Sequence, residues 1–406
     1  MSGLFSPGKI GELEVQNRMI RTASHEGLAD ARGAPTESQF QFYRGFVEGG
    51  IGLVITGYAG IQQNGKSALY RMTMMDADDL VPAHRALVAK IHALGGKIVS
   101  QIAHCGRQTL SAATGEPLLV APSSIPSKFY REVPRALTDH EIQEIIRSFA
   151  AAAARVAAAG YDGVQVHAAH GYLLSSFLSR HANIRRDRWG GSLENRFRIV
   201  GDTLKAVKEA VGQAFPVLIK LNSFEKARKG IKPEECVEFA RLAAKTGCCD
   251  AVEISAGGSG EEAFYMARGK FPTDAILTYM RPYCKKGKGV KFLIRQVVGP
   301  ILSIFHPPFQ EGYNLETAAR VKQAISLPVI TVGGMRTKAF MEAAVSAGKT
   351  DFVSMARPLL LEPDLPNKFR RGESDAAQCD NCNICLMAAD AVPIRCHKDE
   401  FAAGEN

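Results

Sequence analysis

Two histidines and a tyrosine lie within a six-residue segment, His167-Ala-Ala-His170-Gly-Tyr172. The segment directly follows 163–166, a short apolar run that predicts a buried strand. We therefore expect the three side chains at the C-terminal end of a strand, which is the catalytic end in barrels of alternating strands and helices. Two imidazole N–H groups can polarise one carbonyl or nitro oxygen, and a nearby phenol can supply a proton. Each residue alone would suit a structural role, so it is the cluster that indicates a catalytic site.

Four of the nine cysteines are gathered near the C-terminus, as Cys379, Cys382, Cys385 and Cys396. Clustered cysteines in a cytosolic chain indicate metal or redox chemistry rather than disulfides. Their spacing suits the four thiolate ligands of a [4Fe–4S] cluster. The same sulfurs could hold zinc tetrahedrally or remain free thiols, and the spacing alone leaves these three alternatives open.

Eight short β-rich runs recur along the chain, and helix-like segments follow most of them. The runs span 19–23, 51–56, 98–102, 163–166, 217–221, 251–255, 329–332 and 351–355. The helix-like segments include 139–159, 193–211, 233–246, 315–325 and 337–347. This alternation predicts parallel strands joined by right-handed crossovers. Eight units favour an α/β fold of the (β/α)8 TIM-barrel type. A Rossmann fold is less favoured, because the motif Gly-x-Gly-x-x-Gly does not follow the first predicted strand.

Two segments depart from this alternation. Residues 257–313, between the sixth and seventh strands, are too long for a simple loop and predict a lid or subdomain, with Phe264, Tyr265, Phe292 and Ile294 as its small apolar core. Residues 366–406 form a cysteine-rich tail. We therefore expect a barrel over 1–365, including the 257–313 insertion, followed by the tail.

Composition favours a soluble enzyme. The chain has 406 residues, of which 46% are hydrophobic and 22% charged, and these fractions are ordinary for a globular protein. No apolar run approaches the roughly 20 residues that span a bilayer, and the N-terminus has no secretory pattern. We expect a cytoplasmic protein without a membrane span. Its oligomeric state stays open.

Part of the net charge of +9 is concentrated between residues 281 and 295. Lys285, Lys286, Lys288 and Lys291 fall close together there. Such a run is usually a solvated face, but it could attract a phosphorylated substrate, an acidic redox partner or an anionic membrane surface. Nucleic-acid binding is not expected, because no recognition motif accompanies these basic residues.

Further motifs occur in a consistent order along the chain. They are Asn17-Arg18, Gln101-Ile-Ala-His-Cys-Gly-Arg107, the His167–Tyr172 cluster, Arg185-Arg-Asp-Arg-Trp-Gly-Gly-Ser-Leu-Glu-Asn-Arg196, Val332-Gly-Gly334 and Met355-Ala-Arg-Pro358. With these motifs the chain resembles the Old Yellow Enzyme family of flavin-dependent oxidoreductases. More narrowly, it is similar to the barrel of the iron–sulfur branch that includes 2,4-dienoyl-CoA reductase and trimethylamine dehydrogenase. Cys382-Asn-Ile-Cys385 resembles the cluster motif of that branch.

The resemblance implies an FMN site with assigned residues. Gly333 and Gly334 after the seventh strand, with Ala356 and Arg357 after the eighth, would hold the phosphate, as these two loops do in many barrels. Lys220 would lie near flavin N1, where a cation favours the reduced ring, and Gln101 would bond the pyrimidine edge. The residues implied beside the ring are Ala23, Ser24 and Gly57, with His25 as a flavin-tuning residue.

The resemblance also implies a reaction. Reduced nicotinamide, NADH or NADPH, would supply hydride to FMN, and FMN would pass it to the β-carbon of an electron-poor alkene. His167 and His170 would hold the activating carbonyl, and Tyr172 would protonate the α-carbon. The alternative is a flavin dehydrogenase that oxidises an amine or a saturated substrate and passes electrons to a partner protein through the cluster. An inactive barrel with a zinc-stiffened tail is a third reading, against which the intact histidines and tyrosine argue.

Overall fold

The computed structural model describes residues 3–258 and 268–402. Eight parallel strands run in the order β4-β3-β13-β12-β11-β10-β9-β6, and pairing of β4 with β6 closes the barrel. Each lies within two residues of its predicted range, so the predicted TIM barrel is confirmed. The strands are β3 (Met19–Arg21), β4 (Leu53–Ile55), β6 (Ile98–Ala103), β9 (Gly163–Ala168), β10 (Val217–Asn222), β11 (Ala251–Ser255), β12 (Val329–Val332) and β13 (Phe352–Met355).

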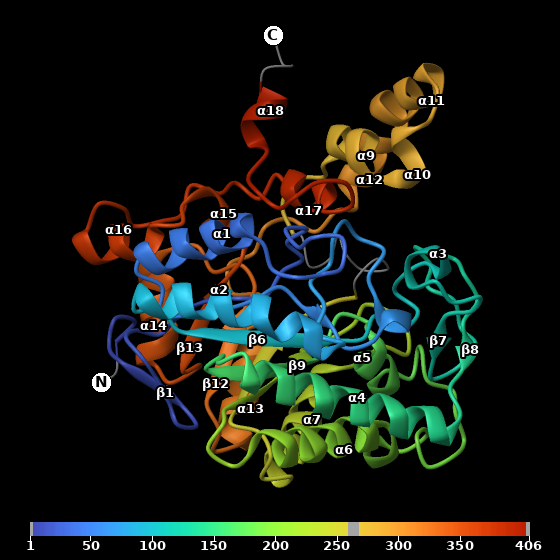
Figure 1. Cartoon of the computed structure of the whole chain (residues 1–406). Coiled ribbons are helices and arrows are strands. Elements are labelled where there is room, and N and C mark those ends of the chain that lie inside the picture. Colours follow the sequence, from blue (N-terminus) through green and yellow to red (C-terminus); the bar gives the residue numbers. More distant parts are fainter. Residues whose placement is uncertain (1–2, 259–267, 403–406) are drawn as a thin grey trace.

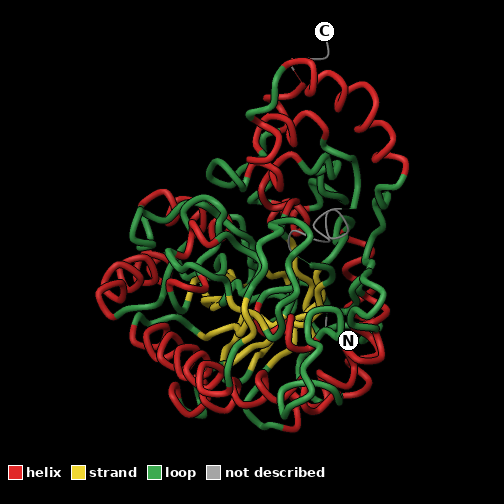
Figure 2. Tube along the Cα trace, turned by 90° about the vertical axis from the view of Figure 1, so that its right-hand side faces the viewer, coloured by secondary structure: helices red, strands yellow, loops and turns green. Residues whose placement is uncertain are grey.

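Helices surround the barrel (Figures 1 and 2). The main ones are α1 (Glu37–Glu48), α2 (Val81–Ala93), α4 (Asp139–Ala158), α6 (Leu193–Val211), α7 (Pro233–Lys245), α13 (Leu315–Ala324), α14 (Lys338–Ser346) and α16 (Leu365–Arg371). The sequence predicts the start of α6 because Ser192 can cap it, and the Ser192 hydroxyl does accept a hydrogen bond from the Asn195 N–H. Shorter elements lie in the connections: α3 (Ser111–Thr114), α5 (Leu173–Leu178), α15 (Arg357–Leu361), β5 (Ala59–Gly60), β7 (Val120–Ala121) and β8 (Arg135–Ala136).

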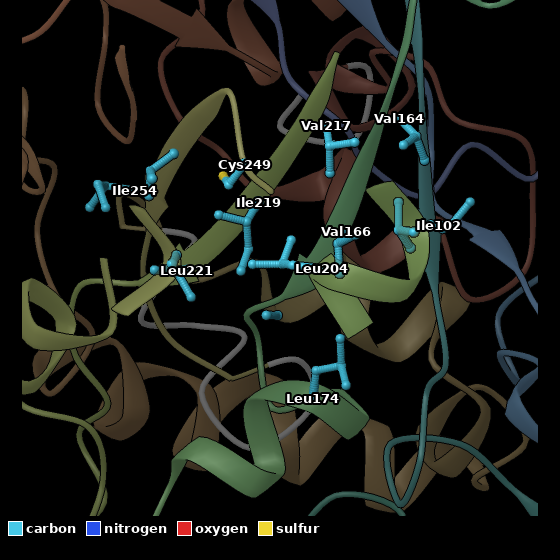
Figure 3. Packing of buried hydrophobic residues seen from close by; sticks show 14 of the residues in the cluster. Ile102, Val164, Val166, Leu174, Leu204, Val217, Ile219, Leu221, Cys249 and Ile254 are labelled. Carbon is cyan, nitrogen blue, oxygen red and sulfur yellow. The ribbon is translucent and has the colours of Figure 1, made fainter. Parts of the chain in front are cut away.

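Alternation along the strands decides which side chains reach the site. Because successive strand residues point to opposite faces, Val164 and Val166 of β9 pack outward against the helices, and Figure 3 shows them with their neighbours. Gln165 and His167 must then point into the barrel. The same alternation turns Lys220 of β10 inward, between the outward-packing Ile219 and Leu221.

A hairpin near the N-terminus closes one end of the barrel. β1 (Gly8–Ile10) and β2 (Leu13–Val15) pair antiparallel. Ile10, Leu13 and Val15 pack in one buried cluster with residues at the starts of the barrel strands, including Leu218 and Phe352. This end is therefore filled with apolar side chains, which leaves the C-terminal ends of the strands for chemistry.

The predicted insertion after the sixth strand is helical where it is described. It contains α9 (Thr273–Tyr279), α10 (Arg281–Cys284), α11 (Lys288–Leu293), a π-helical turn at Ile294–Val298 and α12 (Gly299–Ile304). Of the four residues predicted to form its apolar core, Phe292 is 64% exposed and Ile294 is half-buried. Phe264 and Tyr265 lie outside the described residues. Instead, α9 packs through Ile276 against the tail.

The tail crosses the C-terminal end of the barrel after α16. Leu365 and Phe369 of α16 are buried in the main apolar cluster of the barrel. α17 (Ile384–Ala388) then packs on α9, and α18 (Lys398–Ala402) follows. In the described part of the chain, no helix is long and apolar enough to cross a bilayer.

Candidate active site

His167, His170 and Tyr172 come together at the end of β9. The ring centroids of His167 and His170 are 5.0 Å apart, and those of His167 and Tyr172 are also 5.0 Å apart. His170 has a φ of 61°, a left-handed conformation that non-glycine residues adopt rarely and often at functional sites. The Asn222 side chain accepts a hydrogen bond from the His170 backbone N–H, which supports this turn. The predicted cluster therefore forms one compact group.

Neighbouring groups restrict the protons of both imidazoles. Nδ1 of His167 accepts a hydrogen bond from the Ala169 backbone N–H at 3.2 Å, so a neutral His167 carries its proton on Nε2. Nε2 of His170 lies 2.6 Å from the Ser255 hydroxyl. When that hydroxyl donates, the His170 proton is on Nδ1. Each ring can then offer one N–H donor.

Burial keeps both histidines uncharged. It lowers the pKa of His170 to about 3, helped by the positive charge of Lys220. Burial also lowers the pKa of His167 well below its ordinary value, with further contributions from His170 and Lys220. At neutral pH the pair can donate hydrogen bonds but carries no charge.

A polar network crosses the barrel interior beneath this cluster. The Gln101 amide donates to Gln165 at 2.6 Å, and Gln165 donates to the Glu253 carboxylate at 2.8 Å. Glu253 is also within 3.3 Å of the Lys220 ammonium, and it accepts hydrogen bonds from Thr22 and Ser354. Gln101 and Lys220 are thus held in place by partners that the sequence analysis did not identify.

Two adjoining cavities lie above this network. The larger, about 260 Å³, is lined by the His167, His170 and Tyr172 cluster. Its wall also contains the predicted Ala23, Ser24, His25, Gln101, Ala356 and Arg357, and the unpredicted Tyr58, Tyr130 and Met280. The second, about 140 Å³, is lined by Lys220, Gly333, Gly334 and Arg357. Both cavities share Ala23, His170, Ala356 and Arg357, so they form one continuous site.

The glycines in the second cavity leave no room for side chains. A Cβ on Gly334 would lie 2.2 Å from the Gln310 carbonyl oxygen, and one on Gly333 would lie 2.7 Å from the Tyr313 ring. Arg336, which sequence analysis missed, also lines this cavity. Glycine backbone N–H groups and guanidinium groups are the kinds of donor that bind a phosphate.

Two predicted flavin residues have different surroundings from the rest. Gly57 lines neither cavity; a Cβ there would lie 2.6 Å from the Ser24 carbonyl oxygen, so Gly57 lies behind the Ser24 loop. His25 lines the larger cavity, but its Nε2 donates to the Tyr70 carbonyl at 2.6 Å. Burial lowers the pKa of His25 to about 4, so it too is neutral.

The four tail cysteines border one small cavity next to the site. Cys379, Cys382, Cys385 and Cys396 line it together with Arg357, and Cys385 and Arg357 also line the larger cavity. Burial raises the pKa of Cys385 to about 12, so its thiol must lose a proton before it can bind a metal. Within residues 3–258 and 268–402, no three His, Cys, Asp or Glu side chains already have the arrangement of a metal site.

Comparison with known proteins identifies the family. The model of the NADH:flavin oxidoreductase / NADH oxidase family matches residues 3–258 and 300–376. The chain belongs to this family. This membership agrees with the resemblance to the Old Yellow Enzyme family that the sequence motifs carry.

Named relatives span more than this chain does. A metal reductase of Desulforamulus reducens is 35% identical over 94% of this chain and 51% of its own length. A cinnamate reductase of Clostridium sporogenes is 30% identical over 95% of this chain and 55% of its own. A solved complex of 2-naphthoyl-CoA reductase has a TM-score of 0.80 at 26% identity, covering 96% of this chain and 56% of that one. The chain thus spans about half the length of these relatives.

Proposed function

We propose that this protein is an FMN-dependent ene-reductase that reduces α,β-unsaturated carbonyl or enoate-type compounds with NAD(P)H. The observation that carries the proposal is the convergence of two neutral histidines and one phenol on the wall of a single cavity. The similarity to a cinnamate reductase supports the same class of substrate.

The two cavities fit FMN. Gly333, Gly334, Arg336 and Arg357 would hold the phosphate, and Lys220 would face the flavin ring from the barrel. Gln101 would bond the edge of the ring, next to Ala23. When bound, FMN would supply the hydride chemistry, accepting hydride from the nicotinamide and giving it to the β-carbon of the alkene.

The residues of this chain would activate the substrate. The carbonyl oxygen of the alkene would accept hydrogen bonds from His167 and His170, whose neutral rings are donors that cost little to bury. These bonds strengthen as negative charge develops on the oxygen. Tyr172 would donate its phenolic proton to the α-carbon. Ser255 would act as a positioning residue, because its hydroxyl determines which nitrogen of His170 carries the proton.

We also propose that Cys379, Cys382, Cys385 and Cys396 hold a [4Fe–4S] cluster. The four sulfurs border one cavity, and Cys385 lies in the wall of the substrate cavity, so a cluster there would be adjacent to the flavin. An electron-transfer protein partner could then exchange electrons through the tail. Zinc binding or free thiols remain the outcomes that metal analysis must distinguish.

An anaerobic titration tests the main proposal. The purified protein is loaded with FMN and titrated with NADH and then NADPH, while bleaching of the flavin absorbance is followed. We expect bleaching by one of them and reoxidation by a cyclic enone. A protein that binds no FMN would contradict the proposal. A protein that is bleached by a tertiary amine, and is reoxidised by no alkene, would instead be the dehydrogenase considered above.

A further inference from the structure

A helical arm with an apolar surface leaves the barrel between β11 and β12. We define the arm as residues 281–305, from α10 through α12. Figures 1 and 2 show it projecting from the barrel beside the tail. Fourteen large apolar side chains are exposed in the described part of the chain, and ten of them lie on this arm. Those ten are Tyr283, Val290, Phe292, Leu293, Val297, Val298, Ile301, Leu302, Ile304 and Phe305. Such a concentration marks an interaction surface.

Apolar and basic residues alternate along the arm with helical spacing. Val290, Leu293, Val297 and Ile301 recur every three or four residues and therefore share one side of the helix. Lys288, Lys291 and Arg295 recur with the same spacing on a different side. The arm is thus amphipathic, with a basic polar side.

The charge of the arm has one sign. Residues 275–310 contain six lysines and arginines and no aspartate or glutamate. Arg281 pairs with Asp390, and Arg295 pairs with Asp274 at 2.7 Å, and these two pairs connect the arm to the tail and to α9. The four lysines, at positions 285, 286, 288 and 291, form no ion pair within the described residues. Their charge is available to an anionic partner.

We propose that the arm binds the surface of an anionic phospholipid bilayer. Its apolar side would lie among the acyl chains near the interface, and its lysines would meet the lipid phosphates, which is the usual arrangement of interfacial helices. Phe292 and Leu302 are exposed as well and lie away from the apolar side, and a fluid bilayer can cover side chains that point in several directions.

The arm lies beside the candidate active site. The family model does not match residues 259–299, so the four lysines lie outside the part of the chain that this model describes. Gly299 anchors the arm at its base, since a Cβ there would lie 2.5 Å from the Thr273 hydroxyl. Met280, directly before the arm, lines the larger cavity of the active site. Docking would therefore place the cavity near the membrane, where apolar substrates concentrate.

Vesicle sedimentation tests the proposal with the purified full chain. One set of vesicles contains phosphatidylcholine alone, and the other contains equal parts of phosphatidylcholine and phosphatidylglycerol. We expect sedimentation with the anionic vesicles only, and weaker binding at high salt. Lys288→Gln with Lys291→Gln should weaken binding about 30-fold, since each lysine near such a surface contributes about fivefold. Val297→Asp with Ile301→Asp should abolish binding.

A matched control separates the arm from general surface effects. Leu118→Asp with Ile184→Asp removes two exposed apolar residues elsewhere on the molecule and should leave vesicle binding unchanged. Sedimentation velocity without vesicles is measured in parallel. No binding to anionic vesicles, or equal binding by the arm and control variants, would overturn the proposal. A dimer that Val297→Asp with Ile301→Asp dissociates would identify a second copy as the occupant instead.

Discussion

Tyr172 is the residue on which the proposed proton transfer depends. Its ring is buried and lies 5.1 Å from that of Tyr58, the nearest competing phenol in the cavity. Tyr172→Phe should slow alkene reduction by about 10²–10⁴-fold, the usual contribution of a general acid. Reduction of the flavin by NAD(P)H should be unaffected, because it needs no proton from the phenol. Stopped-flow absorbance separates the two half-reactions. Tyr58→Phe should retain most of the rate, and the reverse result would assign the proton to Tyr58.

The neutral histidines predict an unusual pH dependence. Because the pKa of His170 is lowered from 6.5 to about 3, binding of a neutral enone should show no step near pH 6.5, as followed by the flavin absorbance shift. The stability of the folded protein, in contrast, should depend on pH in this range. The unfolded chain takes up protons below pH 6.5 while the folded chain does not, so the free energy of unfolding should fall as pH drops from 6.5 toward 3. A binding step near pH 6.5 would mean that a histidine in the site is charged.

At the residue scale, the sequence predicts the polar groups that line the larger cavity better than the groups that support them. His167, His170 and Tyr172 were found because they follow a strand together. Gln165 and Glu253 were missed, although each is a polar residue at an inward position of an otherwise apolar strand. A polar residue at such a position could therefore have been predicted to belong to a polar network inside the barrel. Their partners could not be predicted, because they come from strands far apart in the sequence.

At the scale of elements, the loop after β12 is shaped by its glycines. Gly334 has a φ of 70° and backs directly onto the Gln310 carbonyl. Gly334→Ala adds a clash that costs about 1–3 kcal/mol, so FMN affinity should fall about tenfold or more. Fluorescence titration of the protein with FMN measures this. Gly348→Ala is the matched control, since Gly348 has a φ of 67° and open space around it. If Gly334→Ala and Gly348→Ala lowered the FMN affinity equally, the backbone strain at a positive φ would explain the effect, and the clash with Gln310 would not.

The elements of the barrel were predictable, and the arm was not. Strands that are apolar on both faces and capped amphipathic helices give patterns that burial explains, so their ranges agree with the structure. The 257–313 insertion carries apolar residues too, and the sequence suggested that they form a core. Phe292 is exposed instead, and periodicity cannot show what an apolar side faces.

At the scale of the whole molecule, the proposed cluster in the tail would give electrons a route into or out of the barrel. If the four cysteines hold a [4Fe–4S] cluster, anaerobically purified protein should contain iron and sulfide in equal amounts. Cys382→Ser should lose the iron and keep FMN, because Cys382 does not line the larger cavity. Metal analysis with electron paramagnetic resonance of the reduced protein checks both. Zinc in place of iron, or no metal, would contradict the cluster.

Three side chains are shared between the larger cavity and the cavity of the four cysteines. Arg357, Leu360 and Cys385 line both, so occupants of the two cavities would contact the same side chains. A group bound in either cavity would immobilise these shared side chains. Binding of a second group in the other cavity would then cost less conformational entropy. Each bound group should therefore tighten the binding of the other without being required for it.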